Sequence, residues 1–254
     1  MIATNASLGT VGIVRPTQRT AGYEDLLRML PVGVGVMPLC LDVRRGAIDE
    51  FKEAIAGYEA KVAELAGMGV DVINPSGAPP FMVLGYDNEQ ALIRKWERDY
   101  KTRVFTSGTS QIDALRAFKV KRFLGVSYFG GDINRVFAKY FIDAGFDCLD
   151  MAGMDIAFDK VPELPSDQVY RFIKDTFCKH PNAEALYMLG PAWRTLDIVE
   201  KLERDLGVPV VHAVPAQCWD IQRHLNLRKP VQGFGRLIAE MPVSPTMATH
   251  KAAS

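Results

Sequence analysis

The chain alternates short runs of β-branched and apolar residues with longer stretches of helical periodicity, and this alternation constrains its fold more than any other feature. Eight runs predict buried strands: TVGIV (10–14), GVGVM (33–37), VDVIN (70–74), RVFTS (103–107), RFLGVSY (122–128), FDCLDM (146–151), ALYML (185–189) and VPVVHA (208–213). Helical patterns lie between most of them, at 48–69, 88–100, 109–118, 132–143, 166–178, 192–206 and 216–225. This alternation is typical of an α/β fold, with mostly parallel sheets covered by helices on both faces.

The chain also repeats its own plan. TRVFTSGTSQIDAL (102–115) and VPVVHAVPAQCWDI (208–221) each give a strand, a turn of small residues and a helix start that carries a glutamine. A looser match links DVINPSG (71–77) to LYMLGPA (186–192). We therefore predict two similar, Rossmann-like halves related by a pseudo-twofold axis, each with a four-stranded parallel sheet.

The predicted boundaries are 1–118 for the first half and 119–240 for the second, with the chain returning to the first half near 215–240. Residues 241–254 have no periodicity and are expected to form a flexible tail. Because ligands of open α/β sheets bind beyond the carboxyl ends of the strands, the site is expected in the cleft between the halves.

Composition limits the partners. Lys+Arg 30 balance Asp+Glu 30, so no broad nucleic-acid or membrane surface is indicated. No apolar run reaches membrane-spanning length and no basic segment precedes the first apolar stretch, so a cytoplasmic protein is expected. The sequence does not decide the oligomeric state, and a homo-oligomer stays open.

The metal-binding residue types do not gather in this sequence. The four cysteines, Cys40, Cys148, Cys178 and Cys218, are widely separated and form no CxxC pair, which predicts reduced thiols and no zinc site. No cluster of His, Asp and Glu has the spacing of metal ligands, so no metal is expected.

Several segments taken in linear order carry a family resemblance. They are VGIVRPT at the start, GVDVINPSG, TSGTSQIDALRAFKVKRFLGVSYFGGDIN, TLDIVEKLERDLGVPVV and PAQCWD. In this order they resemble the aspartate/glutamate racemase superfamily, and within it maleate cis-trans isomerase and arylmalonate decarboxylase. The resemblance covers nearly the whole chain. It implies two similar α/β domains, no metal or organic cofactor, and a small carboxylate substrate held between the domains.

The sequence departs from this family at its cysteines. The racemases and maleate isomerases carry two, one after a strand in each half, and the decarboxylase keeps only the second. The resemblance places Ser76, or Gly77 beside it, at the first cysteine position and Gly190 at the second. The four cysteines that are present are best read as small core residues, Cys40 being the one that could edge the cleft. Thiolate catalysis is therefore unsupported.

The turns after the strands are the candidate binding elements. Gly77 and Ala78, Thr109 and Ser110, and Gly190 are predicted to present backbone N–H groups and hydroxyls to a carboxylate or an enolate-like dianion, and Pro191 beside Gly190 is a further predicted substrate-binding residue. Plain helix capping would explain the Ser and Thr residues at 106–110 equally well. Ser76 is predicted to hydrogen-bond the substrate. A nucleophilic role is less favoured because no GxSxG motif surrounds it.

Two further residues are predicted to act catalytically. The resemblance implies that Tyr128, which ends FLGVSY, reaches the substrate carboxylate, the alternative being an aromatic packed at a domain edge. His212, in VPVVHAVPA, is a candidate general acid or base in place of the lost thiol. The alternative is a structural histidine with both nitrogens hydrogen-bonded, and the sequence supports the two equally.

Charged and aromatic side chains beside the predicted turns are weaker candidates. Arg15, in VGIVRPT, could pair with a second carboxylate, and Arg194 is its rival. Trp193 and Phe81 could supply an apolar wall. For all four residues a structural role is at least as well supported.

Together these features predict a cofactor-independent enzyme that acts on a small carboxylate through an enolate-like intermediate. Its reaction would be that of a lyase or decarboxylase, an isomerase or a hydrolase, without cysteine catalysis. The alternative is an inactive carboxylate-binding or regulatory protein of the same fold. Dinucleotide binding is weaker still, because no GxGxxG follows a strand and opens a helix.

Overall fold

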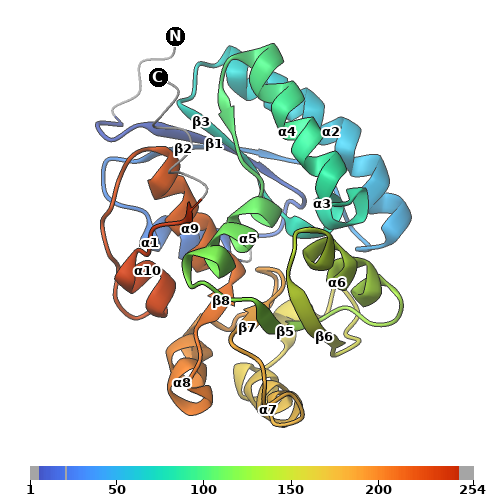
Figure 1. The fold of residues 1–254 in the computed structure, drawn as a ribbon. Coiled ribbons are helices and arrows are strands. Elements are labelled where there is room, and N and C mark those ends of the chain that lie inside the picture. Colours follow the sequence, from blue (N-terminus) through green and yellow to red (C-terminus); the bar gives the residue numbers. More distant parts are fainter. Residues whose placement is uncertain (1–5, 21, 246–254) are drawn as a thin grey trace.

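Two four-stranded parallel sheets form the frame of the molecule (Figure 1). The computed structural model describes residues 6–20 and 22–245. The first sheet has the order β2-β1-β3-β4, from β1 (Thr10–Arg15), β2 (Gly35–Cys40), β3 (Val72–Pro75) and β4 (Arg103–Val104). The second has the order β6-β5-β7-β8, from β5 (Arg122–Ser127), β6 (Asp147–Gly153), β7 (Leu186–Met188) and β8 (Val210–His212). The predicted α/β fold with two parallel sheets is confirmed.

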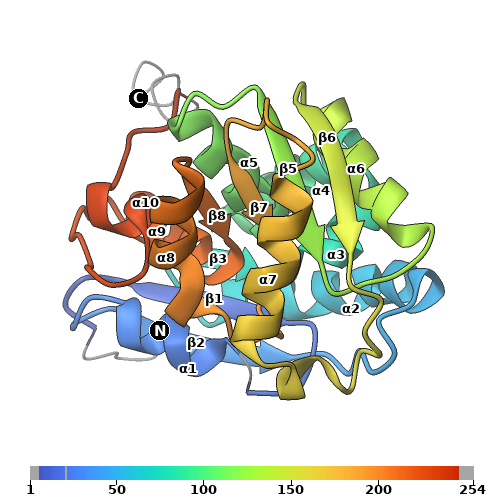
Figure 2. The same cartoon turned by 90° about the horizontal axis from the view of Figure 1, so that it is seen from below.

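Helices cover both sheets. Those of the first half are α1 (Tyr23–Met29), α2 (Ile48–Gly67), α3 (Ala78–Leu84), α4 (Tyr86–Tyr100) and α5 (Ser107–Ala117). The second half contributes α6 (Ile133–Asp143), a 3-10 turn (Val161–Glu163), α7 (Ser166–Phe177), α8 (Leu196–Leu206), α9 (Ala213–His224) and α10 (Arg236–Glu240). Figure 2 shows α7 and α8 side by side on the second sheet, and α5 and α9 pack against each other where the two halves meet.

The two sheets are built on one plan, because strands β1 to β4 map in order onto β5 to β8. The backbone hydrogen bonds repeat as well. The N–H of Ser76 donates to the carbonyl of Val14 (2.7 Å), and the N–H of Leu189 donates to the carbonyl of Val126 (2.9 Å). Ser76 and Leu189 are therefore equivalent positions, each the first residue after the third strand of its half.

The sequence repeat at 102–115 and 208–221 has a structural counterpart. Thr106 caps the N-terminus of α5 by accepting from the Thr109 N–H, and His212 caps α9 by accepting from the Val214 N–H. Each cap stands five residues before the glutamine that the repeat shares, Gln111 or Gln217. Helix α9 packs against α1 and β3, which precede it by more than a hundred residues in sequence.

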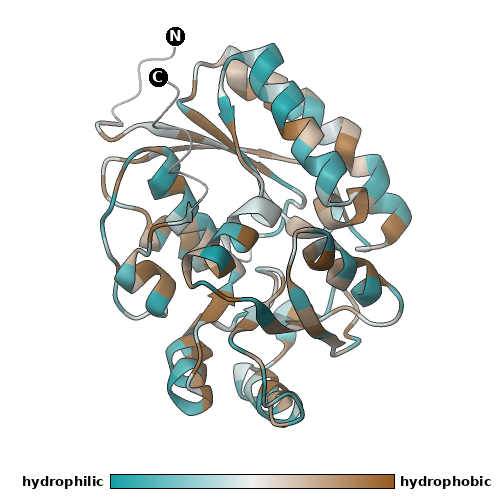
Figure 3. Cartoon of the chain, in the orientation of Figure 1, coloured by the Kyte–Doolittle hydropathy of each residue, from teal (hydrophilic) through white to brown (hydrophobic). Residues whose placement is uncertain are grey.

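The apolar periodicity of 48–69 becomes α2. Its buried residues Phe51, Tyr58, Val62 and Leu65 share one side of the helix, and the polar side faces outward (Figure 3). Three of them join residues of β1, β3 and α4 in a core on one face of the first sheet. Burial of each large apolar side chain contributes about 1.5–3 kcal/mol, which fixes this helix in place.

Local chemistry explains one helix that was not predicted and one strand that is shorter than predicted. Helix α3 was not predicted, because Pro79 and Pro80 suggest a turn; both lie in its first turn, where a missing N–H costs nothing. Strand β4 is shorter than the predicted 103–107, because Thr106 already caps the following helix.

The segment predicted as a flexible tail begins with packed residues. Met241 and Ser244 are buried, and the indole N–H of Trp219 donates to the carbonyl of Pro242 (3.2 Å). Residues 246–254 lie outside the described residues. In the part of the chain that the structure describes, no helix combines the length and the apolar character needed to cross a membrane.

Candidate active site

A pocket opens between the carboxyl ends of the central strands of the two sheets. It contains about 610 Å³ of empty space, including space open to solvent. The first half lines it with Ile13, Arg15, Pro16, Thr17, Arg19, Gly22, Tyr23, Ser76 and Gly77, and the second half with Tyr128, Phe158, Pro191, Ala192 and Gln217. The predicted position of the site, beyond the strands and between the halves, matches this pocket.

The resemblance assigns one cysteine position to Ser76 or the neighbouring Gly77 and the other to Gly190, and in the structure Gly77 and Gly190 are equivalent. Gly77 and Gly190 each follow one of the equivalent positions defined above, and their φ values are +91° and +85°. A Cβ on Gly77 would lie 2.7 Å from Cγ of Pro16, and a Cβ on Gly190 would fall on the hydroxyl of Tyr128. Pro16 and Tyr128 are themselves equivalent, since each follows the last residue of the first strand of its half. The space that a side chain would need is thus occupied at both positions, and the backbone there favours glycine.

Tyr128, which the resemblance assigned to the substrate carboxylate, lines the pocket. It is 3 % exposed, and its ring packs edge-on against Trp193, with a centroid distance of 5.4 Å. Burial raises the pKa of the Tyr128 phenol, while the Arg19 guanidinium opposes that rise. The hydroxyl lines the pocket in its protonated form and can donate a hydrogen bond to an anion there.

Two guanidinium groups give the pocket a positive charge. Arg15 lies over the ring of Tyr23, with 4.7 Å from its Cζ to the centroid, and donates to the carbonyl of Arg19. Arg19 lies over the ring of Phe158 at 4.8 Å and donates to the Phe158 carbonyl (2.8 Å). Among the described lining residues there is no Asp or Glu. A pocket with two cations and no carboxylate attracts an anion.

Ser76 is held by its backbone, which leaves its side chain for a ligand. Its carbonyl accepts from the Tyr58 hydroxyl (2.6 Å), and its N–H is used by the sheet. The neighbouring Gly77 N–H is not free for an anion, because it donates to Ser107 Oγ (3.0 Å). Gln217 donates from Nε2 to Asn74 Oδ1 (2.7 Å), which fixes its amide at the pocket.

His212 is placed outside the pocket lining. It is 1 % exposed; Nδ1 accepts from the Val214 N–H (3.2 Å), and Nε2 lies 3.0 Å from Thr195 Oγ1. Burial lowers the pKa of the imidazole to about 3. In this structure His212 is therefore a neutral helix cap with both nitrogens engaged, which is the alternative that the sequence had left open.

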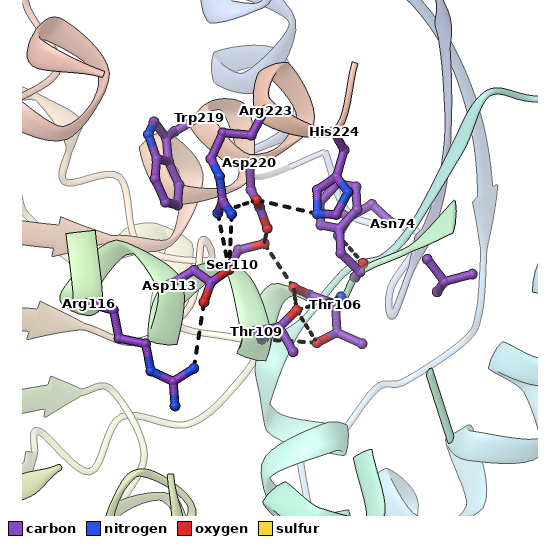
Figure 4. Close-up of polar contacts among 12 residues, drawn as sticks. Asn74, Thr106, Thr109, Ser110, Asp113, Arg116, Trp219, Asp220, Arg223 and His224 are labelled. Atoms are coloured by element: carbon purple, nitrogen blue, oxygen red, sulfur yellow. Dashed lines mark hydrogen bonds and ion pairs between the residues drawn. The ribbon is translucent and has the colours of Figure 1, made fainter. Parts of the chain in front are cut away.

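Thr109 and Ser110 belong to a polar network between α5 and α9, and neither lines the pocket (Figure 4). Thr109 completes a capping box with Thr106. Ser110 Oγ donates to Asp220 Oδ2 (2.7 Å), and Arg223 donates to the other carboxylate oxygen of Asp220 (2.8 Å). Both hydroxyls thus serve the helix ends and the contact between the halves.

The remaining predicted residues divide between the pocket and the core. Pro191 lines the pocket, whereas Ala78 is buried beneath it, 3 % exposed. Arg194 is exposed, and Phe81 packs in the core against Tyr58. None of the four cysteines lines the pocket, and the described residues contain no group of three or more His, Cys, Asp or Glu side chains placed to hold a metal ion.

Nine lining residues were not predicted as site residues from sequence, and four of them matter for the site: Arg19, Tyr23, Phe158 and Gln217. Arg19 and Tyr23 lie in an irregular loop and at the start of a short helix, where no periodicity marks a site. Phe158 lies in a loop of the second half, 139 residues from Arg19 in sequence. The internal repeat did mark Gln217, as the counterpart of Gln111, but did not show that only Gln217 faces the pocket.

The fold and the pocket define a class: two-sheet α/β proteins with a cationic site between pseudo-equivalent halves. The family model for arylmalonate decarboxylase matches residues 13–238, and the chain belongs to this family. The resemblance drawn from the sequence is confirmed.

Two curated relatives match part of the chain. The arylmalonate decarboxylase of Bordetella bronchiseptica is 26% identical over 141 residues, which are 53% of this chain and 57% of that protein. The maleate isomerase of Nocardia farcinica is 26% identical over 138 residues, 54% of this chain and 55% of that protein. The chain thus spans about half the length of each curated relative.

A solved structure matches far more of the chain. It is a cysteine-to-serine mutant of the Nocardia farcinica maleate cis-trans isomerase with a covalently bound succinylcysteine intermediate. It aligns with a TM-score of 0.81 at 22% identity, covering 91% of this chain and 98% of that one. At this identity the match establishes the fold.

Proposed function

We propose that the protein is a cofactor-independent enzyme that acts on a small carboxylate through an enolate-like intermediate. The observation that carries the proposal is the pocket, where Arg15 and Arg19 supply positive charge and no described carboxylate neutralises them. The family relatives that act on malonates and maleate support the substrate class.

The pocket offers donors for negative charge that builds up on a substrate. The phenol of Tyr128 and the hydroxyl of Ser76 come from opposite halves and line the same space. A carboxylate that activates its own α-carbon places two negative charges on one carbon–oxygen framework as the reaction proceeds. Fixed donors directed at those oxygens stabilise the transition state more than the ground state.

The chemistry proposed here does not use a thiol. One relative has a covalently bound succinylcysteine intermediate, whereas this chain has Ser76 or Gly77 at one candidate position and Gly190 at the other. The Cβ sites of the two glycines are filled. Decarboxylation, hydration, elimination and hydrolysis need stabilised negative charge and a proton, but no covalent sulfur adduct. We place decarboxylation first, because the pocket pairs fixed oxyanion donors with largely apolar walls.

Proton NMR in D2O tests the proposal. Purified protein is incubated with malonates, maleate, substituted maleates, hydantoins and cyclic imides, beside Tyr128→Phe and Ser76→Ala variants. We expect conversion or α-deuteration of at least one carboxylate, slowed at least tenfold by Tyr128→Phe, since one lost oxyanion donor costs about 10²–10³ in rate.

The same NMR experiment tests a second candidate function, which is binding of carboxylates without catalysis. The absence of a thiol at either position also fits a protein that only binds or senses carboxylates. Line broadening of an acid that is recovered unchanged after long incubation would support that role. No reaction and no binding by any carboxylate would contradict both.

A further inference from the structure

The proposed reaction needs a proton donor, and only a few side chains that line the pocket can supply a proton. Among the described lining residues, the side chains that titrate are Arg15, Arg19, Tyr23 and Tyr128. A guanidinium stays protonated in proteins and does not exchange its proton during turnover. Two phenols remain, and they differ in their surroundings.

Tyr128 is much less exposed to solvent than Tyr23. Tyr128 is 3 % exposed and packs among aromatic rings, so a phenolate there would be poorly hydrated. Tyr23 is half-buried at the start of α1, with its ring beneath the Arg15 guanidinium. It therefore touches both the pocket and water, as a group that delivers a proton on every turnover must.

We propose that Tyr23 is the catalytic proton donor of this pocket, and that Arg15 positions its ring and stabilises the phenolate left after transfer. The inference rests on the proposed function and deepens it, because it names the group that stands in for the missing thiols. Arg15 is a positioning residue in this role, held by its bond to the Arg19 carbonyl.

In decarboxylation, the Tyr23 proton replaces the departing carboxylate on the α-carbon of the substrate. The departing carboxylate leaves as CO2, and its bonding electron pair stays on the α-carbon, delocalised onto the remaining carboxylate. That pair takes the phenolic proton of Tyr23, so a C–H bond forms and an O–H bond breaks. Water then returns a proton to the phenolate and releases hydroxide, so the substrate anion and water give product, CO2 and hydroxide.

The charges around Tyr23 agree with a donor that starts protonated. Burial raises the pKa of the Tyr23 phenol, Arg15 opposes the rise, and Cys40 adds to it. A phenol above its usual pKa is neutral at pH 7, and the cation above its face stabilises the anion during transfer.

The test compares Tyr23→Phe with Tyr170→Phe, a matched change on α7, on a prochiral 2,2-disubstituted malonate in D2O. We expect wild-type protein and Tyr170→Phe to give one enantiomer carrying a single deuterium. Tyr23→Phe should lower kcat by about 10²- to 10⁴-fold and give racemic residual product, because water then protonates either face. Malonate affinity, measured by calorimetry, should change by less than about threefold.

The outcomes separate the two proposals. Wild-type kcat and a single enantiomer from Tyr23→Phe would overturn the role of Tyr23 and leave the proposed function standing. No turnover of any carboxylate by wild-type protein would overturn the proposed function itself. If Tyr23→Phe does not fold, 3-fluorotyrosine at position 23 replaces it. The more acidic phenol should then move the alkaline limb of the kcat–pH profile to lower pH, and an unmoved limb would contradict the inference.

Discussion

The hydroxyl of Tyr128 occupies the space that a side chain on Gly190 would need. The glycine also adopts a φ of +85°, which non-glycine residues rarely adopt. Tyr128 thus leaves no room for a side chain at position 190 after the third strand of the second half. Pro16 does the same at position 77 in the first half.

The first prediction concerns this packing. Gly190→Ala should destabilise the fold by about 1–3 kcal/mol through the strained φ and the clash with Tyr128. Adding Tyr128→Phe should recover part of the loss by removing the hydroxyl. Urea unfolding measures both. Gly67→Ala is the control, since a Cβ at Gly67, the last residue of α2, meets nothing within 4 Å and should leave stability equal or higher. Equal stability of Gly190→Ala and wild type would refute the clash.

The second prediction concerns the charge of the pocket. Arg15→Gln should weaken maleate and malonate binding about 10- to 100-fold, because hydrogen bonds to a charged group contribute roughly 1.5–3 kcal/mol. Calorimetry measures the dissociation constants. Arg98→Gln, an exposed change on α4, is the control. Unchanged binding by Arg15→Gln would show that the anion is held elsewhere.

The third prediction concerns Glu89, which is 0 % exposed and accepts from Thr106 Oγ1 (2.5 Å) and the Tyr140 hydroxyl. Burial raises its pKa from 4.5 to about 7. The folded state therefore binds the proton more tightly than the unfolded chain, and stability falls as pH rises between these values, by at most about 3 kcal/mol. Glu89→Gln should remove this slope, as followed by urea unfolding at about pH 5 and about pH 8. A slope that persists would assign it to another group.

The fourth prediction has the opposite sign. Burial lowers the His212 pKa from 6.5 to about 3. Between these pH values the unfolded chain therefore binds a proton at His212 and the folded state does not. Stability present above pH 6.5 should be lost as pH falls towards 3, and His212→Asn, which can still cap α9, should flatten that loss. Activity of the folded variant separates the two roles. A helix cap predicts a kcat within several-fold of wild type, and a general acid predicts a loss of about 100-fold or more.

The strands, most of the helices and the internal repeat could be predicted from sequence, but the contacts that loops make across the pocket could not. Residues that are buried on a sheet recur at regular intervals in the sequence, both in the strands and in α2. This regular apolar pattern can be recognised without the structure. Ser76 was predicted from the turn after a strand and Tyr128 from the family resemblance, and both line the pocket. Arg19 and Phe158 meet only after two loops from different halves fold over each other. Their contact depends on tertiary packing, which cannot be predicted from the residues next to them in the sequence.

The link between Arg19 and Phe158 joins a loop of one half to a loop of the other at the pocket. Both residues also line the space where a ligand would sit. An anion bound in the pocket would therefore touch both loops, and we expect its binding to depend on the contact between them. We expect the lifetime of a bound anion to depend on how long the Arg19 guanidinium keeps its hydrogen bond to the Phe158 carbonyl.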